Sequence, residues 1–372
     1  MNNRLYLSKR LLLLRWVWCV AMLLGPCTLA RAVPFPPDAL PGLDIGGSLP
    51  GGYEPSGVVW HHRLDRLFVV SDNGTVSYMK ADGTNVVNWS VEGDLEGIAV
   101  ADYSSNVIYL GVENPDGIRE FDIGSGSVTR TFDLTPWMTG PSNSGLEALT
   151  FVPDASNPEG GLFYAGLQAD GSIYKFELPI QSSVISTTVM HKGTITPVAG
   201  RTDISGLHYD VDSRVLYAIF DSSNTLRAMD AAGSLIKEWS LAGSNQEGIV
   251  LDVDTNNLFI AEDSGRVMVY SPFPIIPEGD INGDGFVGAD DLVTVLTYWG
   301  QSGITRNEGD LTGDQFVGAD DYVEVLTCWG SGTPPEPIPE STTLIILLSL
   351  SSLALLRWRK QLPTRLLTKE PA

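Results

Sequence analysis

Basic residues, histidine and cysteine are scarce in this 372-residue chain, which has 23 Lys and Arg against 45 Asp and Glu, four His and three Cys. Ten of the basic residues but only one acid lie in residues 1–32 and 344–372, so the middle keeps 44 acids against 13 bases. Such an acidic surface repels phosphate backbones, which argues against a nucleic-acid partner. Only Cys328 lies in the middle, so no disulfide can form within this part of the chain. Bound divalent cations, Ca²⁺ above all, are expected to stabilise its fold instead.

The body of the chain, residues 33–275, lacks both a long helical pattern and any familiar catalytic motif. It has no nucleophile elbow, no HExxH, no glycine loop that would cradle a phosphate and no cysteine-based metal site. Its hydrophobic runs are short, β-branched and aromatic, and Gly, Asp, Asn and Ser separate them. This pattern is typical of strands joined by tight turns, so we predict an all-β fold.

The hydrophobic runs repeat. Five units open at residues 56, 96, 147, 205 and 247 with the phrases SGVVW, EGIAV, EALTF, SGLHY and EGIVL, and two or three further strands follow in each unit. Repeats of this kind indicate a β-propeller, in which successive blades bury each other's faces. We count five blades, although the long interval between Glu147 and Ser205 leaves room for a sixth. The stretch 39–49 is expected to supply the strand that the last unit lacks, which closes the ring.

Over most of residues 40–273 the repeats resemble the SdiA-regulated β-propeller family, which is similar in turn to the esterase-like phytase propellers. The phrases DLEGIAV, GLEALTF, DISGLHYD and NQEGIVLD at the blade starts carry this resemblance. It implies a calcium-binding propeller in the periplasm or outside the cell, with no firmly assigned reaction.

Three acids stand just before innermost strands, at equivalent blade positions: Glu96, Glu147 and Glu247. Equivalent positions lie at one height of the central channel, so the carboxylates are expected to converge and to raise one another's pKa values. A divalent cation would relieve the repulsion, which predicts a central metal site. The alternative is that each Glu caps a turn toward solvent. Ser56 and Ser205 fill the remaining blades, and His208 either lines the channel or packs in the core or on the surface.

After the body, "GDINGDGFVGADDLVTVLTYWG" (279–300) returns as "GDLTGDQFVGADDYVEVLTCWG" (309–330). Oxygen donors at loop positions 1, 3, 5, 7 and 12 fit a Ca²⁺ loop, and a helix is expected to follow each. The predicted ligands are Asp280, Asn282, Asp284, Phe286 and Asp291 in the first loop, and Asp310, Thr312, Asp314, Phe316 and Asp321 in the second. Gln315 replaces Gly285 at the sharp turn, so the second site is predicted to be weaker. The alternative is an acidic, solvated loop.

This pair of loop-plus-helix units, residues 278–330, resembles a type I dockerin module. The resemblance implies a small all-α module with two Ca²⁺ ions, which docks onto a cohesin in an assembly that handles polysaccharides. Ala289-Asp290 and Ala319-Asp320 occupy the positions that the family uses for partner choice, and their identity in both copies implies binding in two orientations.

Both ends of the chain are predicted to be targeting segments. Residues 1–32 combine basic residues, the apolar run WVWCVAMLL and ARA at 30–32, as in a secretory signal cleaved after Ala32. A Pro- and Thr-containing linker, 331–343, leads to an apolar run, Leu344 to Leu356, and then to basic residues. As a helix this run is roughly 20 Å long, shorter than the ~30 Å membrane core. It predicts a short transmembrane helix that serves as a processing signal.

With Pro335-Glu336-Pro337 and Pro339-Glu340-Ser341 before it, the tail 344–372 resembles a PEP-CTERM sorting signal. The resemblance implies transient membrane anchoring, processing by an exosortase, and a place on the surface or in the extracellular matrix of a Gram-negative bacterium. An unprocessed tail anchor is the alternative.

Two classes of function remain open from the sequence. The first is a non-catalytic, calcium-stabilised binding or scaffold propeller in an extracellular, polysaccharide-related assembly. The second is a calcium-dependent hydrolase on the same scaffold, phytase-like or otherwise acting on phosphoesters, or degrading polysaccharide. No pair of carboxylates is singled out as a glycosidase pair. The first class is favoured because no base and nucleophile stand out.

Overall fold

The computed structural model describes residues 33–36 and 41–334. The predicted secretory signal, residues 1–32, and the predicted sorting tail, residues 344–372, lie outside the described residues. Within the part of the chain that the structure describes, no helix has the length and apolarity needed to cross a membrane.

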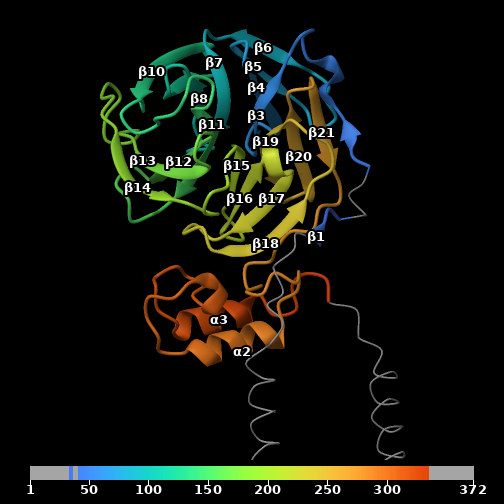
Figure 1. Ribbon diagram of the computed structural model, residues 1–372, viewed down its shortest axis with the longest axis vertical. Coiled ribbons are helices and arrows are strands. Elements are labelled where there is room, and N and C mark those ends of the chain that lie inside the picture. The colour runs from blue at the N-terminus through green and yellow to red at the C-terminus, as the bar shows by residue number, and fades with distance from the viewer. Residues whose placement is uncertain (1–32, 37–40, 335–372) are drawn as a thin grey trace, which may run out of the picture. The chain divides into compact units, whose positions relative to one another are not determined.

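Five sheets form a ring of blades, and the four strands of each blade are antiparallel (Figure 1). Blade 1 contains β3 (Pro55–His61), β4 (Arg66–Ser71), β5 (Thr75–Met79) and β6 (Val87–Ser90). Blade 2 contains β7 (Asp94–Ala99), β8 (Val107–Glu113), β9 (Gly117–Asp122) and β10 (Ser127–Asp133). Blade 3 contains β11 (Leu146–Pro153), β12 (Gly161–Leu167), β13 (Ser172–Glu177) and β14 (Met190–Ile195).

Blade 4 contains β15 (Ile204–Asp210), β16 (Val215–Phe220), β17 (Thr225–Met229) and β18 (Leu235–Ser240). Blade 5 contains β19 (Gln246–Asp252), β20 (Asn257–Glu262) and β21 (Arg266–Tyr270), and its outermost strand is β2 (Leu43–Asp44) from the start of the chain. The five-bladed fold and its closure by the 39–49 stretch are therefore confirmed. The sequence did not predict β1 (Val33–Pro34), which pairs in parallel with β18.

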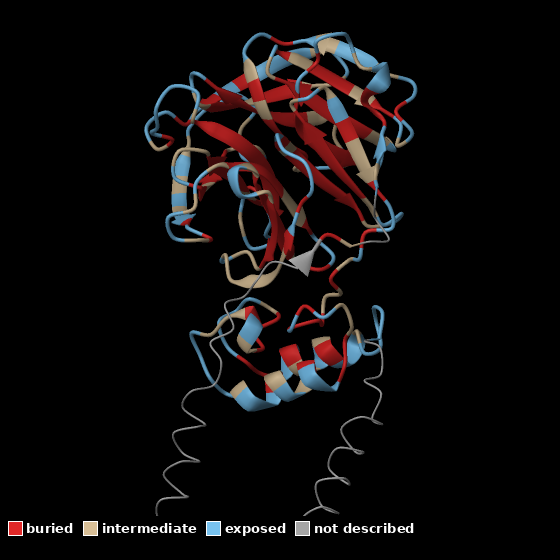
Figure 2. Ribbon diagram, turned by 45° about the vertical axis from the view of Figure 1, so that its right-hand side comes forward, coloured by how far each residue is buried: buried red, intermediate tan, exposed pale blue. Residues whose placement is uncertain are grey.

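Neighbouring blades bury each other's apolar faces, and the inner and middle strands are the most fully buried (Figure 2). At the seam between blades 5 and 1, the rings of Trp60 and Phe259 are stacked with their centroids 5.9 Å apart. Phe259 is fully buried, which is worth about 1.5–3 kcal/mol for a side chain of this kind. The last blade is therefore held to the first by packing as well as by strand pairing.

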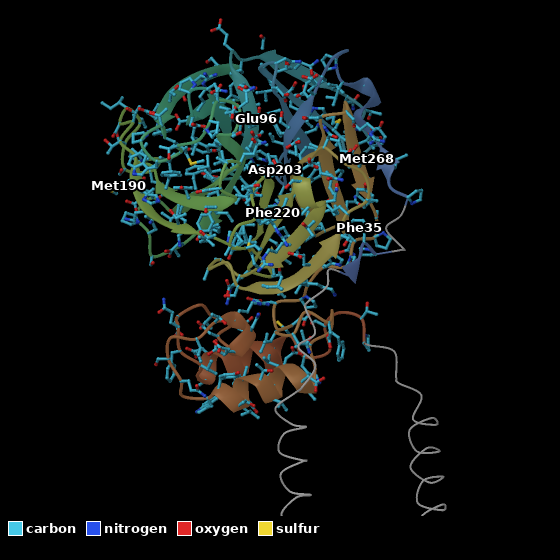
Figure 3. All side chains as sticks on the ribbon, in the orientation of Figure 1. Phe35, Glu96, Met190, Asp203, Phe220 and Met268 are labelled. Atoms are coloured by element: carbon cyan, nitrogen blue, oxygen red, sulfur yellow. The ribbon has the colours of Figure 1, made fainter. Side chains whose placement is uncertain are left out.

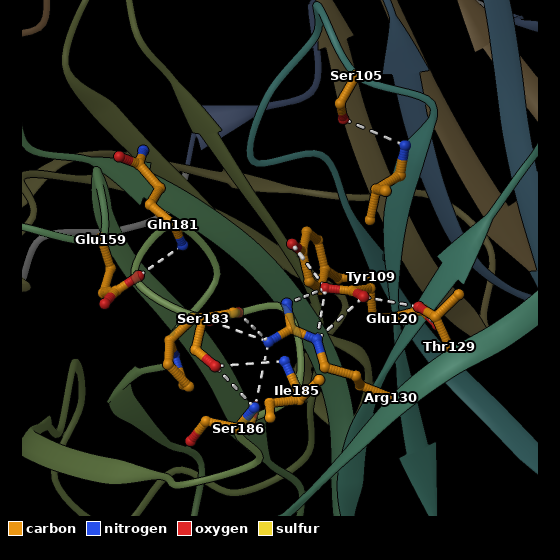
Figure 4. Close-up of polar contacts among 12 residues, drawn as sticks. Ser105, Tyr109, Glu120, Thr129, Arg130, Glu159, Gln181, Ser183, Ile185 and Ser186 are labelled. Carbon is orange, nitrogen blue, oxygen red and sulfur yellow. Dashed lines mark hydrogen bonds and ion pairs between the residues drawn. The ribbon is translucent and has the colours of Figure 1, made fainter.

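The long interval in blade 3 holds no sixth blade, because the segment between β13 and β14 is an irregular loop, residues 178–189 (Figure 4). The Arg130 guanidinium of blade 2 donates hydrogen bonds to three carbonyl oxygens, those of Pro179 (2.9 Å), Ser183 (2.7 Å) and Ser186 (3.1 Å). The same guanidinium pairs with Glu120. A buried ion pair thus holds the loop in the place where a further blade had been considered.

The duplicated segment forms two helices, α2 (Ala289–Tyr298) and α3 (Ala319–Thr327), and a short 3₁₀ turn, η4 (Arg306–Glu308). Two further 3₁₀ turns, η2 (Gly46–Ser48) and η3 (Asp221–Ser223), lie in the propeller. The predicted helix after each loop is confirmed. Both copies have the same succession of buried and exposed residues over 291–300 and 321–330. The small shared core of the segment consists of Ile281, Val287, Val295, Leu311, Val317 and Val325.

Candidate functional site

A β-bulge occurs at the start of every innermost strand. In each blade the register shifts at the position that opens the repeat, and the shifts enclose Ser56, Glu96, Glu147, Ser205 and Glu247. A bulged residue drops out of the strand pairing, and bulges commonly re-aim a side chain next to a functional site. The fold therefore releases the predicted glutamates from the regular alternation of the strand.

The residue after the bulge must be small because the inner strands nearly touch around the axis. A Cβ added to Gly97 would lie 2.7 Å from the Cβ of Leu149 in the next blade. A Cβ on Gly206 would lie 2.6 Å from the carbonyl oxygen of Glu247, and one on Gly248 would lie 2.8 Å from the Cα of Gly57. Since blade 3 has Ala148 at this position, glycine is needed in four of the five blades.

The inner strands surround a cavity of about 10 Å³, lined by residues of all five blades, among them Glu96, Glu147 and Ser205. This volume is about that of one water-sized sphere. Glu247 is not among the lining residues. In Figure 3, Glu96 and Asp203 lie toward the middle of the ring, whereas Met190 lies at its periphery. Two of the three predicted glutamates thus meet at one ion-sized space.

Burial and neighbouring acids raise the pKa of each of the three glutamates. Burial and then the charges of Glu147, Asp72 and Asp94 raise the pKa of Glu96 well above its ordinary value. Burial and then the charge of Glu113 also raise the pKa of Glu147. Burial, Asp263 and then Glu147 raise the pKa of Glu247 to about 10. None of the ion pairs among the described residues involves these three side chains.

A wider set of acids surrounds the three glutamates, and the sequence analysis missed it. Its members lie at or after the ends of second strands, or at or just before the starts of inner strands: Asp72, Asp94, Glu113, Asp116, Asp203, Asp221 and Asp263. Several of them hold the loops in place, since Glu113 accepts a hydrogen bond from the Gly145 amide (2.6 Å) and Asp221 accepts one from the Gln246 amide (2.9 Å). The recurrence of an acid directly after β16 and β20, and at the end of β8, was a signal available in the sequence.

The serine hydroxyls of the other two blades, Ser56 and Ser205, donate hydrogen bonds within the protein. Ser56 donates to the Asp72 carboxylate at 2.5 Å, and Ser205 donates to the Gln246 carbonyl at 2.6 Å. His208 lies at the other end of its strand, where it lines a different and larger cavity. Burial lowers the pKa of His208 to about 3. It therefore lies away from the glutamates and is neutral at ordinary pH.

The two duplicated loops have matching hydrogen bonds. The position-1 acids are buried and each accepts backbone amides across the turn: Asp280 from Gly283 (2.7 Å) and Asp310 from Gly313 (2.8 Å). The position-12 acids are also buried, and each accepts a hydrogen bond from the amide of the residue directly before α2 or α3, Gly288 or Gly318 (2.8 Å each). Burial raises the pKa of Asp280 to about 6.

The other predicted loop ligands are more exposed. Asn282 and Asp284 are exposed, as is Asp314, while Thr312 is half-buried and donates to Asp321 (3.1 Å). Phe286 is half-buried and Phe316 is 42% exposed, and the prediction assigns only their carbonyl groups to the metal. Because side-chain oxygens stand along a loop whose ends are already organised by two buried carboxylates, the residues fit a Ca²⁺ cage.

Gln315 adopts the left-handed conformation, with φ +67°, which corresponds to φ +92° at Gly285 in the first copy. The strain expected from the sequence is therefore present in the second loop.

Comparisons with known proteins divide the propeller into two parts. Residues 51–172 match the phytase-like family, described as esterase-like activity of phytase, and residues 186–272 match the SdiA-regulated family. No curated protein matches the chain.

Two solved structures are similar at low identity. The Cps50 (Swd1) β-propeller domain of Myceliophteria thermophila is 11% identical, with a TM-score of 0.36, over 56% of this chain and 62% of that one, so the match spans less than two thirds of its length. The glutaminyl cyclase of Myxococcus xanthus is 14% identical, with a TM-score of 0.43, over 59% of this chain and 90% of that one. The body of the chain is a five-bladed β-propeller whose successive parts match the phytase-like and SdiA-regulated families.

Proposed function

We propose that this chain is a secreted, calcium-binding β-propeller with a binding or scaffold role, joined to an extracellular assembly through its dockerin-like module. The observation that carries the proposal is the convergence of bulged glutamates from neighbouring blades on one ion-sized cavity, with no cationic side chain paired to them among the described residues. Glu147 is buried and Glu96 and Glu247 are half-buried, so their ionised forms are costly without a cation beside them, and Ca²⁺ prefers carboxylate oxygens. A calcium ion at Glu96, Glu147 and Glu247 would link the blades to one another.

Exposed apolar side chains on the two helices and directly after them support the docking role. Both copies expose the same three types at the same spacing, with exposed fractions between 45% and 58%: Val293, Leu296 and Trp299 on one, and Val323, Leu326 and Trp329 on the other. Residues 289–290 and 319–320 are exposed beside them. Apolar patches on a small module are typical of interaction sites. A cohesin-like partner, in either of two orientations, fits this duplicated surface.

The predicted secretory signal and sorting tail complete the proposal. They place the protein, after passage through the inner membrane and exosortase processing, at the cell surface or in the matrix of a Gram-negative-type bacterium. Extracellular polysaccharide is the expected setting.

A second candidate, a calcium-dependent hydrolase, is favoured by the match of residues 51–172 to the phytase-like family. Under this alternative, a Ca²⁺ ion bound by the glutamates would let the surrounding set of acids accept a phosphoester that their carboxylates would otherwise repel.

A substrate screen separates the two candidates. We expect the full chain to bind Ca²⁺ yet to hydrolyse no phosphoester, lactone or glycan faster in calcium than in chelator. Calcium-dependent turnover that falls by tenfold or more in Glu147→Gln, while an exposed-site variant such as Glu92→Gln keeps it, would establish the hydrolase instead.

A further inference from the structure

A second cavity, of about 510 Å³, is lined by residues at and beyond the ends of the inner strands. Most of the lining is apolar, and its polar groups include His62, His208, Tyr103 and Asp254. A largely apolar hollow with a few convergent polar groups is the usual form of a small-ligand site. The bulged glutamates lie at the opposite ends of the same strands, so this cavity is separate from the calcium site proposed above.

Three potential metal ligands meet at the rim of this cavity. One ligand atom each from His62, Asp252 and Asp254 lie within 4.8 Å of one another. The Nδ1 atom of His62 is 4.0 Å from Oδ2 of Asp254. His62 follows β3 and Asp252 ends β19, so the cluster lies at the seam between the first and the last blade (Figure 1).

Asp252 gives an independent indication of a ligand. It is only 2% exposed, its Oδ2 accepts the hydroxyl of Thr255, and its Oδ1 has no hydrogen-bond partner. A buried carboxylate oxygen without a partner is unfavourable unless something binds it. Asp252 therefore has a free acceptor oxygen close to His62.

The preceding blade offers an internal comparison. Asp210 of β15 occupies the position of Asp252 in the same Asp-Val-Asp phrase, but both of its oxygens have partners, the amide of Asp212 (3.1 Å) and the hydroxyl of Ser213. Blade 5 follows blade 4 in the ring as blade 1 follows blade 5. In blade 5 the position that corresponds to His62 is Val253, whose side chain offers no metal ligand. The unpartnered oxygen and the histidine thus occur together at one seam.

The geometry points to a binding site for a divalent transition-metal ion of the Zn²⁺ type, held by His62, Asp252 and Asp254, and we propose this as a second metal site of the propeller. One imidazole nitrogen with two carboxylates selects a borderline ion, since Ca²⁺ takes oxygen ligands whereas imidazole suits zinc and its neighbours. Tyr103, whose ring centroid is 5.0 Å from that of His62, packs edge-on and fixes the imidazole orientation.

Such an ion would have two consequences. It would join blade 5 to blade 1 at the seam where the ring closes. Three protein ligands also leave at least one coordination position of a tetrahedral ion open. Because His62 and Asp254 line the cavity, that position is available to water or to a donor atom of a molecule in the cavity.

The test uses the untagged full chain in saturating Ca²⁺, titrated with Co²⁺ as the probe and followed by its visible absorption and by equilibrium dialysis. The duplicated segment holds a competing group, Glu278, Glu324 and Cys328, so the experiment is done in a Cys328→Ser background. We expect one tightly bound Co²⁺ that Zn²⁺ displaces and millimolar Ca²⁺ does not. It should raise the melting temperature by a few degrees.

Replacing His62 by Gln should weaken Co²⁺ binding at least tenfold and remove that shift, and the variant should fold because the His62 side chain is 41% exposed. Asp252→Asn should act alike, and Asp210→Asn, its match in blade 4, should bind Co²⁺ as the parent does. Unchanged Co²⁺ affinity in folded His62→Gln, or displacement by Ca²⁺, would overturn the proposal. Either result would leave the glutamate site untouched, since calcium is present throughout.

Discussion

The small residue after each bulge decides how closely the inner strands approach the axis. Replacing Gly97 by Ala would put a methyl group 2.7 Å from the Cβ and 2.8 Å from the amide nitrogen of Leu149. Overpacking of this kind costs about 1–3 kcal/mol. We therefore expect Gly97→Ala to lower the free energy of unfolding in urea by that amount. Gly47→Ala is the control, because a Cβ there meets nothing within 4 Å, and an equal loss in both variants would contradict the crowding argument.

Gln315 is expected to weaken the second predicted calcium loop through its backbone alone. A Cβ at the matching position, Gly285, meets nothing within 4 Å, so the difference between the two loops is the cost of a left-handed φ, on the order of 1 kcal/mol. Gln315→Gly should tighten the second site about fivefold, and Gly285→Gln should weaken the first by a similar factor. The calcium-induced rise in helical circular dichroism measures both, and equal midpoints in all three proteins would show that φ is not the cause.

The Arg130–Glu120 pair and the 178–189 loop act as one structural element. Burial alone would raise the pKa of Glu120, but hydrogen bonds from Arg130 and Thr129 hold it below its usual value of 4.5. A lowered carboxyl pKa stabilises the fold above the unfolded pKa, and this contribution is lost as the pH falls through the folded one. Breaking a buried pair costs about 3–5 kcal/mol.

Glu120→Gln should therefore have a melting temperature well below that of the parent at pH 7. The difference between the two melting temperatures should narrow as the pH falls below about 4.5, because the parent loses the contribution of the ionised Glu120. Asp65→Asn is the control, since it removes the Arg66–Asp65 pair (4.0 Å), in which the Asp65 side chain is 81% exposed, and it should shift the melting temperature little at any pH. A gap of the same size at pH 7 and pH 3 would show that Glu120 acts through packing rather than through its charge.

Much of this architecture was predictable because local patterns dictate it. A repeated phrase opens each inner strand, with glycine in four blades and alanine in the third, so the five blades, the outer strands of four of them and the closing strand β2 were predictable from the sequence. The sequence could not show that residues 178–189 form a loop and not part of a sixth blade. The contacts that hold this loop come from Arg130, some fifty residues earlier in the chain. The His62–Asp252 seam was likewise hidden, since its members lie at opposite ends of the propeller sequence and meet only when the ring closes.

The closed ring brings acids from several blades together, and the proposed calcium site depends on this convergence. No single blade holds a calcium site of this kind, because Glu96, Glu147 and Glu247 belong to blades 2, 3 and 5. Binding to the folded ring alone should stabilise all five blades together. At a hundredfold excess of Ca²⁺ over Kd the gain is about 2.7 kcal/mol, or roughly 5–10 °C for a domain of this size.

The most direct measurement is calcium-dependent melting of the full chain in which Asp280→Ala and Asp310→Ala have disabled the two loops. We expect the propeller transition to lie several degrees higher in Ca²⁺ than in chelator, and Glu147→Gln to remove most of that difference while Glu92→Gln, at an exposed site, keeps it. Identical melting in calcium and in chelator would contradict the central claim, and the glutamates would then be ordinary bulge residues.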